Sequence, residues 1–487
     1  MLQSLVTARE LSVDQKNKTV PGNGLDVNIA IVGGGASGLT LAYALEHNLG
    51  HRVTVFEGNS RVGGKVFSPK IGDEVYDVGA VLIDSNFTKM LLDDQCRLPY
   101  NDTYMFSVWD TQEEGNPQKL AFIPGLEAFG FNDYIKEIPA WIRVYNTYKY
   151  IYEDPMGFFQ YERNRPLYVP FDEFIKENGI ETLGQAFRNS YVLYGYGFGE
   201  DVPAMYILKF MLRVLSPESL SPILAGAGTG EPLVLESVVL PGGGQALFEC
   251  LASTLRDVRL STTVKSITRG KGIIQVETGQ GDVLLYDRVV ITTDLLQALS
   301  FLDAREDEFR LFSSIRHNIY ISSAVQGMNV PDFPNEHVGI DSLIFPYNMY
   351  QNRSMFPQGL GSKPLPDNPS VTAIAYQYDT LYTARDVITA GGSTLTPIVN
   401  DSEYGYLEQY ARQFLNKSGI SFDNIGSQYI WPTYFPHFGS KDLGAGAYKS
   451  LASLQGRDGT YYAGSLFNFE TIQGVTDFAI ALAKTIQ

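Results

Sequence analysis

The first residues that could bind a ligand are three glycines near the start of the chain. Gly33, Gly35 and Gly38 follow an apolar run, and Glu57 ends a second apolar run nineteen residues after Gly38. In this spacing the first glycine permits a tight turn, the second lets the backbone approach a pyrophosphate, and the third allows a helix to pack closely on a strand. The pattern predicts strand, glycine turn, helix, strand and acid, which is the fingerprint of a dinucleotide site.

The residues between these glycines support the same prediction. Ala36 and Ser37 open the expected helix, whose free N–H groups and positive dipole end favour phosphate groups. Glu57 is placed to accept hydrogen bonds from ribose hydroxyls and to disfavour a 2′-phosphate. The alternative is a purely structural glycine turn, against which the flanking strands and the acid both count.

A second glycine-rich segment follows the acid directly. It contains Arg61, Gly63, Gly64 and Lys65, and the segment 77–81 comes soon after. A cation beside a diphosphate offsets its charge, and paired glycines let the main chain lie against a flat ring system. The alternative here is a surface turn that happens to carry two cations.

These two segments read R-x-G-G-K and D-x-G-A, and they resemble a pattern of the flavin-containing amine oxidoreductase superfamily, which holds FAD rather than NAD. The resemblance implies that Gly79, Ala80 and Val81 also contact FAD. It further implies that the backbone of Val264, on a strand after the glycine turn 242–244, meets the adenine.

The end of the chain resembles the closing motif of the same superfamily, in which a helix begins beneath the flavin. The resemblance implies FAD contacts by five residues, which are Gly464, Ser465, Ile472, Gly474 and Val475. Ser465 stands where an acid is common and Gln473 where a glutamate is common. Both keep hydrogen-bonding capacity but lose the charge.

Length and composition bound the remaining possibilities. A chain of 487 residues with 44% hydrophobic residues indicates two closely linked domains rather than one simple core. The net charge of −17 argues against nucleic acid or anionic membrane as partner, and no apolar run is long enough to span a bilayer. The five histidines show no metal-ligand spacing, so no metal site is expected.

The two cysteines and the sequons leave the compartment open. For Cys96 and Cys250 we expect two buried thiols, with one bridge as the alternative. The first 24 residues are polar, but N-x-S/T triplets occur at six asparagines. A cytoplasmic location and a secreted or lumenal one with a removed leader both remain.

The predicted fold class is α/β, with an FAD-binding Rossmann-like domain and a discontinuous substrate domain of mixed sheet plus helices. We assign 26–100, 236–300 and 443–487 to the FAD-binding domain, and 101–235 and 301–442 to the substrate domain. In the latter, 101–235 reads as helical and 301–442 as strand-rich.

Two internal segments, 170–209 and 431–464, resemble a branch that includes polyenoic fatty acid isomerase and beta-cyclopiazonate dehydrogenase. The branch implies hydride abstraction from a lipophilic or aromatic small molecule in a dry cavity. We expect an oxidase or dehydrogenase of secondary metabolism, with O2 as a candidate acceptor, and keep a redox-neutral double-bond isomerase as the alternative. The branch isomerase holds a carboxylate through an Arg, but the corresponding residues 102–106 contain no Arg or Lys, which argues against a free fatty acid.

Three residues are candidates for the chemistry itself. His437 could act as general base, or be a structural imidazole bonded to the backbone. Tyr196 and Tyr434 could line an aromatic cage beside the flavin, or simply pack in the core. The segment 226–230 reads G-A-G-T-G, which lacks the last glycine of the dinucleotide fingerprint, and no acid follows at the expected distance. No second site, for NAD(P)H, is therefore expected.

Overall fold

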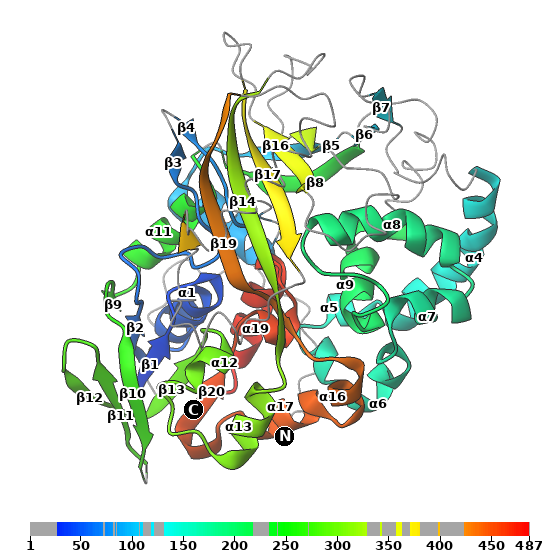
Figure 1. The fold of residues 1–487 in the computed structure, drawn as a ribbon. Coiled ribbons are helices and arrows are strands. Elements are labelled where there is room, and N and C mark those ends of the chain that lie inside the picture. The colour runs from blue at the N-terminus through cyan, green and yellow to red at the C-terminus, as the bar shows by residue number, and fades with distance from the viewer. Residues whose placement is uncertain are drawn as a thin grey trace.

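The structure is a computed structural model of the chain (Figure 1). It describes residues 27–71, 74–80, 83, 85–106, 108–110, 118–120, 131–217, 233–240, 242–270, 272–328, 341–342, 357–362, 371–379, 398–399 and 423–486.

A five-stranded parallel sheet forms the first layer. Its strands are nearly all apolar, as expected for strands that are covered on both faces. The strands come from positions spread between Asn28 and Tyr462, yet they pair side by side in one sheet. In spatial order the strands are β20 (Thr460–Tyr462), β13 (Arg288–Ile291), β1 (Asn28–Val32), β2 (Arg52–Phe56) and β9 (Val258–Arg259).

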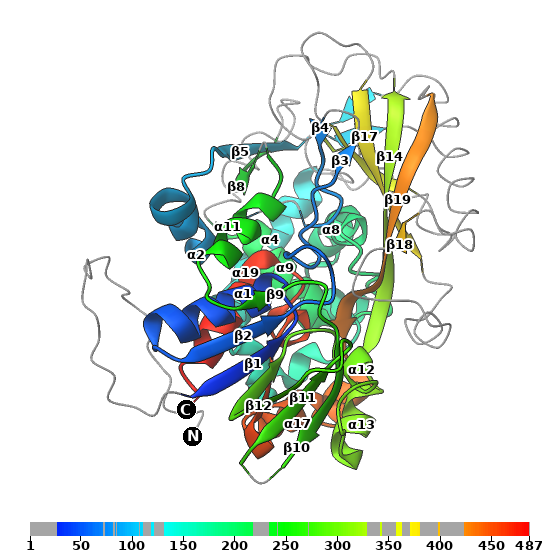
Figure 2. The ribbon, with the colours of Figure 1, turned by 90° about the vertical axis from the view of Figure 1, so that its left-hand side faces the viewer.

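Two helices cover one face of this sheet. Helix α1 (Ala36–Tyr43) follows the glycine turn, and α19 (Ile472–Ala483) packs against it from the other end of the chain (Figures 1 and 2). Both helices bury most of their length. Helices from opposite ends of the chain therefore pack together on one face of the sheet.

A three-stranded antiparallel sheet is inserted between β9 and β13. Its strands are β10 (Val264–Arg269), β11 (Ile274–Thr278) and β12 (Val283–Tyr286). In Figure 1 this sheet lies below β1 and β2, at the lower left of the molecule. In the chain, helix α11 (Gln245–Ser253) precedes β9 and this sheet.

A mixed-length antiparallel sheet forms the second large layer. Its long strands rise beside the parallel sheet in Figure 2, and their pairing confirms the strand-rich interpretation of this part of the chain. In spatial order the strands are β15 (Asp341–Ser342), β16 (Pro357–Ser362), β17 (Val371–Asp379), β14 (Arg316–Met328), β19 (Asn424–His437) and β18 (Ile398–Val399).

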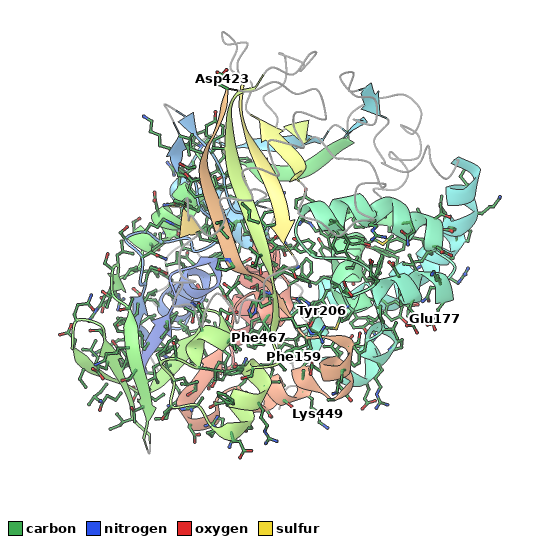
Figure 3. All side chains as sticks on the ribbon, viewed as in Figure 1. Phe159, Glu177, Tyr206, Asp423, Lys449 and Phe467 are labelled. Carbon is green, nitrogen blue, oxygen red and sulfur yellow. A yellow bond between two sulfur atoms is a disulfide. The ribbon has the colours of Figure 1, made fainter. Side chains whose placement is uncertain are left out.

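A group of helices between β5 (Asn101–Phe106) and its partner β8 (Leu233–Val239) completes the molecule. Tyr206 lies within this group (Figure 3). Where the group meets the final helices, the rings of Phe159 and Phe467 stack with their centroids 6.1 Å apart. The α/β fold class with added sheet and helices is confirmed. The longer helices of the group are α4 (Phe131–Tyr148), α7 (Phe171–Glu177), α8 (Glu181–Leu193) and α9 (Ala204–Val214).

The two cysteines correct one prediction. Cys96 and Cys250 are joined in a disulfide rather than left as two thiols. The bond ties the π-helical turn η3 (Leu91–Cys96) to α11, and these elements come into contact although 154 residues separate the cysteines. The composition gave no means of deciding this, because the pairing depends on how two distant segments pack.

Candidate functional site

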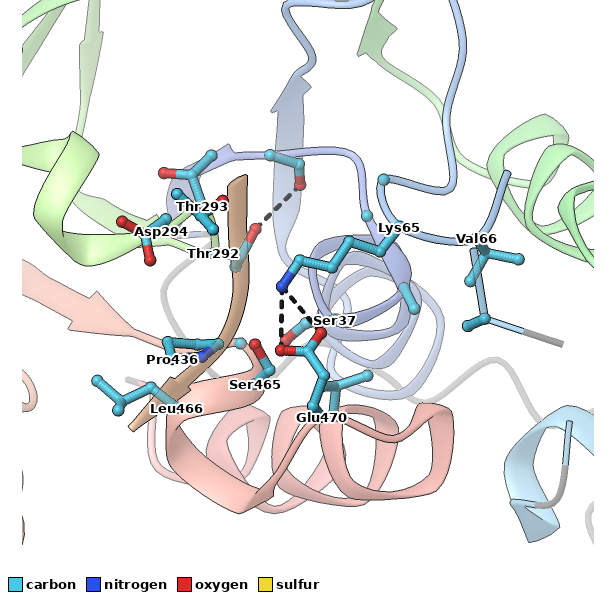
Figure 4. A pocket seen from close by; sticks show the side chains of 18 of the residues that line it. Ser37, Lys65, Val66, Thr292, Thr293, Asp294, Pro436, Ser465, Leu466 and Glu470 are labelled. Atoms are coloured by element: carbon cyan, nitrogen blue, oxygen red, sulfur yellow. Dashed lines mark hydrogen bonds and ion pairs between the residues drawn. The ribbon is translucent and has the colours of Figure 1, made fainter. Parts of the chain in front are cut away.

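A cavity of about 1170 Å³, counting its open mouth, lies at the carboxyl ends of the parallel strands. Open α/β sheets bind ligands at this edge. Figure 4 shows its walls, which come from five segments: 33–37 with Glu57, 63–66 with Ala80, 292–295, 431–436 and 463–475.

The glycine turn forms the floor of the cavity. Gly33 has a φ of +115°, and a Cβ on Gly38 would lie 2.0 Å from the Gly33 carbonyl oxygen. Helix α1 begins at Gly35 without a side-chain cap, so its first N–H groups remain available at the cavity. Ser37 carries a buried hydroxyl that has no hydrogen-bond partner among the described residues. The turn thus offers donors for an anion.

Glu57 lines the same end of the cavity. One carboxylate oxygen accepts the Gly34 N–H at 2.7 Å, and the other accepts the backbone and side-chain N–H groups of Asn59 at 2.8 and 2.7 Å. Burial raises the pKa of Glu57 above its usual value, although these hydrogen bonds oppose the shift. The carboxylate is held in place and leaves lone pairs for ribose hydroxyls.

The second glycine segment lies against the first. Gly63 forms a bridge with Gly35, and the Cα of Gly35 lies 3.1 Å from where a Cβ on Gly64 would stand. Arg61 donates hydrogen bonds to the carbonyl oxygens of this loop and stacks on Phe67 at 3.8 Å. Burial lowers the pKa of Arg61 to about 10. Arg61 therefore shapes the loop from behind rather than lining the cavity.

Lys65 and Glu470 meet across the cavity, as Figure 4 shows. The Lys65 Nζ donates to both Glu470 carboxylate oxygens, at 2.8 and 3.0 Å. The Phe435 N–H donates to one of the same oxygens at 3.0 Å, and the Tyr196 hydroxyl donates to the Glu470 backbone carbonyl at 3.3 Å. Glu470 is the residue at which the cavity meets the aromatic side chains described below.

The end of β13 supplies a third wall. The Thr293 hydroxyl oxygen is buried and, among the described residues, lacks a hydrogen-bond partner. Asp294 accepts from Gln297 N–H, which caps α12 (Leu295–Ala298), and pairs with His317 Nε2 at 2.5 Å. Burial alone would raise the pKa of Asp294, but the interactions with His317, the Gln297 N–H and Lys65 together hold it below its usual value.

The closing segment completes the cavity. Thr471 caps α19 by accepting the Gly474 N–H at 3.0 Å, and Asn468 donates to the Gly474 carbonyl at 3.0 Å. A Cβ on Gly474 would lie 2.2 Å from the Asn468 carbonyl oxygen. Gly474 is thus packed within the turn, while Ser465 and Val475 face the cavity.

Some of the predicted cofactor residues line the cavity and others do not. Four support the walls from behind, and these are Gly38, Arg61, Gly79 and Gly474. Val264 lies at the start of β10, away from the lining, and Val81 falls outside the described residues. The remaining predicted residues line the cavity together: Gly33, Gly35, Ala36, Ser37, Glu57, Gly63, Gly64, Lys65, Ala80, Gly464, Ser465, Ile472 and Val475.

Several lining residues were missed by the sequence analysis. Glu470 and Trp431 lie next to segments that the analysis singled out, so their neighbourhood was a usable signal. Thr292, Thr293 and Asp294 follow an apolar strand whose carboxyl end had to meet the others at one sheet edge. That edge position was the signal that could have found them.

The candidate catalytic residues lie beside the cavity rather than in its lining. Tyr196 and Tyr434 stack at 6.3 Å, and Tyr434 stacks on Tyr320 at 4.8 Å. Phe435 and Phe469 pack on Tyr196 at 5.2 and 4.7 Å. We call these five side chains the aromatic cluster.

His437 occupies a different environment. Its ring is buried, and Nδ1 lies 2.8 Å from the Phe435 carbonyl oxygen. Burial lowers the pKa of His437 to about 3, which makes it a weak base. This placement favours the structural alternative for His437.

Two general searches of the described residues bear on partners. No helix there has the length and apolar character needed to cross a membrane. No group of three metal-ligating side chains is found within the same ranges.

Comparisons with known proteins show which families the chain resembles. A model described as an NAD(P)-binding Rossmann-like domain matches residues 31–92, and one described as flavin containing amine oxidoreductase matches residues 218–326. Over these residues the chain is similar to the flavin-containing amine oxidoreductases. The protein is an oxidoreductase and its cofactor is FAD.

Individual relatives cover nearly the whole chain. An FAD-dependent oxidoreductase of Apiospora sacchari, dpasF, is 25% identical over 96% of this chain and 93% of its own. The CLA-producing fatty acid isomerase from P. acnes has a TM-score of 0.74 at 24% identity, covering 94% of this chain and 98% of its own. Putrescine oxidase with bound putrescine has a TM-score of 0.64 at 15% identity, with the same coverages.

The cavity fits FAD on its own features. The glycine cradle leaves no room for a Cβ at Gly33 or Gly38, and two buried hydroxyls in its walls lack partners among the described residues. The donor-rich turn suits a diphosphate and Glu57 suits a ribose. When bound, FAD supplies an acceptor for a hydride.

Proposed function

We propose that this oxidoreductase removes a hydride from a lipophilic or aromatic small molecule, as an oxidase or dehydrogenase of secondary metabolism. The observation that carries the proposal is the aromatic cluster, which joins the cavity at Glu470. Aromatic faces and apolar residues would surround such a substrate and exclude water from it. The full-length relative dpasF, an FAD-dependent oxidoreductase, supports this class.

Residues of the chain would have separate tasks in this reaction. The glycine turn, Glu57, Ser37 and the loop at Lys65 would hold FAD, while Tyr196 and Tyr434 would line the path of the substrate. Burial raises the pKa of both tyrosines, so each stays a neutral phenol near neutral pH. We propose them as positioning residues rather than as proton acceptors.

The second candidate is a redox-neutral double-bond isomerase. The structural similarity to a fatty acid isomerase favours it. Residues 102–106 contain no Arg or Lys, which argues against a free fatty acid as substrate. Their side chains lie outside the described ones, so this expectation stays a prediction. Both candidates need the same FAD site and differ in whether electrons leave the enzyme.

An anaerobic titration separates the candidates. Purified yellow protein is mixed without oxygen with linoleic acid, tryptophan or cyclohexylamine. The flavin absorbance at about 450 nm is followed during the titration. Bleaching that reverses with hydrogen peroxide formation when air enters supports the oxidase. Conversion of linoleic acid to an isomer while the flavin stays oxidised supports the isomerase instead. Protein that contains no flavin would overturn both.

A further inference from the structure

Three carboxylates among the described residues line the cavity, and two of them are committed to local structure. Glu57 holds the backbone of Gly34 and Asn59, and Asp294 holds α12 and His317. The third, Glu470, is paired with Lys65. Lys65 is the single cation in the described lining, and Asp294 also interacts with it electrostatically, so the Lys65–Glu470 pair is a main determinant of the charge in its part of the cavity.

The backbone on both sides of the contact is strained in the same way. Phe435, whose N–H binds the Glu470 carboxylate, has a φ of +49°, and Phe469, which precedes Glu470, has a φ of +83°. A positive φ at such a bulky residue is energetically unfavourable and is frequent at functional sites. The fold thus holds Phe435 and Phe469 in unfavourable backbone conformations, and these conformations position the Glu470 contact.

Lys65 is held from its own side. The Ala80 N–H donates to the Lys65 carbonyl at 3.0 Å, and a Cβ on Gly79 would lie 1.9 Å from that oxygen. The Lys65 side chain is 31% exposed and that of Glu470 is 9% exposed, so the pair is largely shielded from water. Charges in such surroundings interact more strongly than charges in bulk solvent.

The sheet order places Glu470 and Glu57 at different parts of the cavity. Glu57 follows β2, whereas Glu470 follows β20, which stands three strands away. At about 4.8 Å per strand, the two strands are roughly 14 Å apart. Lys65 belongs to the loop after β2 and reaches Glu470 from that side. With an ADP half held at the glycine turn and Glu57, a flavin half would extend toward the side on which Glu470 lies.

We propose that Glu470 sets the reduction potential of the bound FAD by neutralising Lys65. The reduced cofactor carries more negative charge than the oxidised one, so an unpaired cation nearby favours reduction and an unpaired anion opposes it. The paired side chains hold the local charge near zero. This goes beyond the proposed function, because it requires bound FAD but no substrate.

The test is a dye-coupled potentiometric titration of the purified holoenzyme at pH 7. E470Q leaves Lys65 unpaired, so the equilibrium should shift at least tenfold toward reduced FAD, an increase of about 30 mV for a two-electron couple. K65M leaves Glu470 unpaired, so the potential should fall by a similar amount. The double variant should return close to the wild-type potential.

A matched control uses an ion pair outside the cavity. Lys265 and Glu277 pair at 2.6 Å between β10 and β11, and neither K265M nor E277Q should change the potential. Shifts of the same sign in E470Q and K65M would indicate a merely structural role and overturn the proposal. An unchanged potential in E470Q would overturn it as well. If K65M fails to retain flavin, the sign of the E470Q shift decides alone.

Discussion

The glycine wall of the cavity and the aromatic cluster beside the cavity are built by different means. The glycine wall, made by 33–38 and 63–66, is defined by backbone: missing Cβ atoms, free N–H groups and loop-to-loop bridges. The aromatic cluster lies outside the lining and is defined by side chains from the connection between α8 and α9, from β14 and β19, and from the closing turn. The glycine wall tolerates almost no change, whereas the cluster can change shape residue by residue.

The largest effect is expected where the glycine wall is tightest. Gly38→Val would place its Cβ 2.0 Å from the Gly33 carbonyl oxygen and 2.8 Å from the Thr292 hydroxyl. We expect the free energy of unfolding to fall by about 3 kcal/mol and flavin content roughly tenfold or more. The ratio of flavin to protein absorbance and the melting temperature measure both. Gly444→Ala, which has open space around it, is the control and should behave as wild type.

The disulfide tests whether the glycine wall needs support from outside the cavity. Replacing Cys96 and Cys250 together by Ser should lower the free energy of unfolding by about 2–4 kcal/mol, because the unfolded chain gains freedom. Flavin absorbance should be unchanged, since neither cysteine lines the cavity. Urea unfolding with and without reductant measures the effect. A variant as stable as wild type would show that the bond contributes nothing.

A pH effect probes the support behind the aromatic cluster. Lys209 is buried and donates to the Ile151 carbonyl and to Asn468 Oδ1, both at 2.7 Å, and burial lowers its pKa to about 7. Above pH 7 the unfolded chain keeps this proton and the folded chain releases it, so stability should rise by roughly 2 kcal/mol between pH 7 and 9.

Lys209→Met should remove that rise, and comparing urea unfolding of the two proteins at both pH values measures it. Asp477 and Asp154 are the charged groups that face Lys209 and act in the opposite direction. A wild-type protein whose stability stays flat over this range, or a variant that keeps the rise, would contradict the assignment.

The smallest effect is expected within the aromatic cluster itself. Tyr196→Phe removes the 3.3 Å hydrogen bond to the Glu470 carbonyl and the hydroxyl interaction with Tyr434, at a cost of about 1 kcal/mol, and keeps the ring stacking. Flavin should be retained in full, in contrast to Gly38→Val. Thermal unfolding with flavin fluorescence measures both, and Tyr43→Phe at an exposed hydrogen bond serves as control. Loss of flavin in Tyr196→Phe would remove the distinction between the glycine wall and the aromatic cluster.

The same contrast explains what the sequence could predict. The glycine wall comes from short motifs whose spacing carries its own geometry, so thirteen predicted residues do line the cavity. Glu470 and the end of β13 were missed because their role depends on pairing over hundreds of residues. His437 was singled out by its residue type, while its burial became visible only with the packing around it. The disulfide depended on tertiary contact in the same way.

The order of the parallel strands has a consequence for synthesis. The cavity needs both Val32, at the end of the first strand, and β20, which begins at Thr460. At 5–20 residues per second, a ribosome takes roughly 20–90 s to travel between them. Until β20 is made, β13 carries an open edge and the cavity lacks the wall formed by 463–475. Binding of FAD in the complete cavity therefore requires that synthesis has passed these segments.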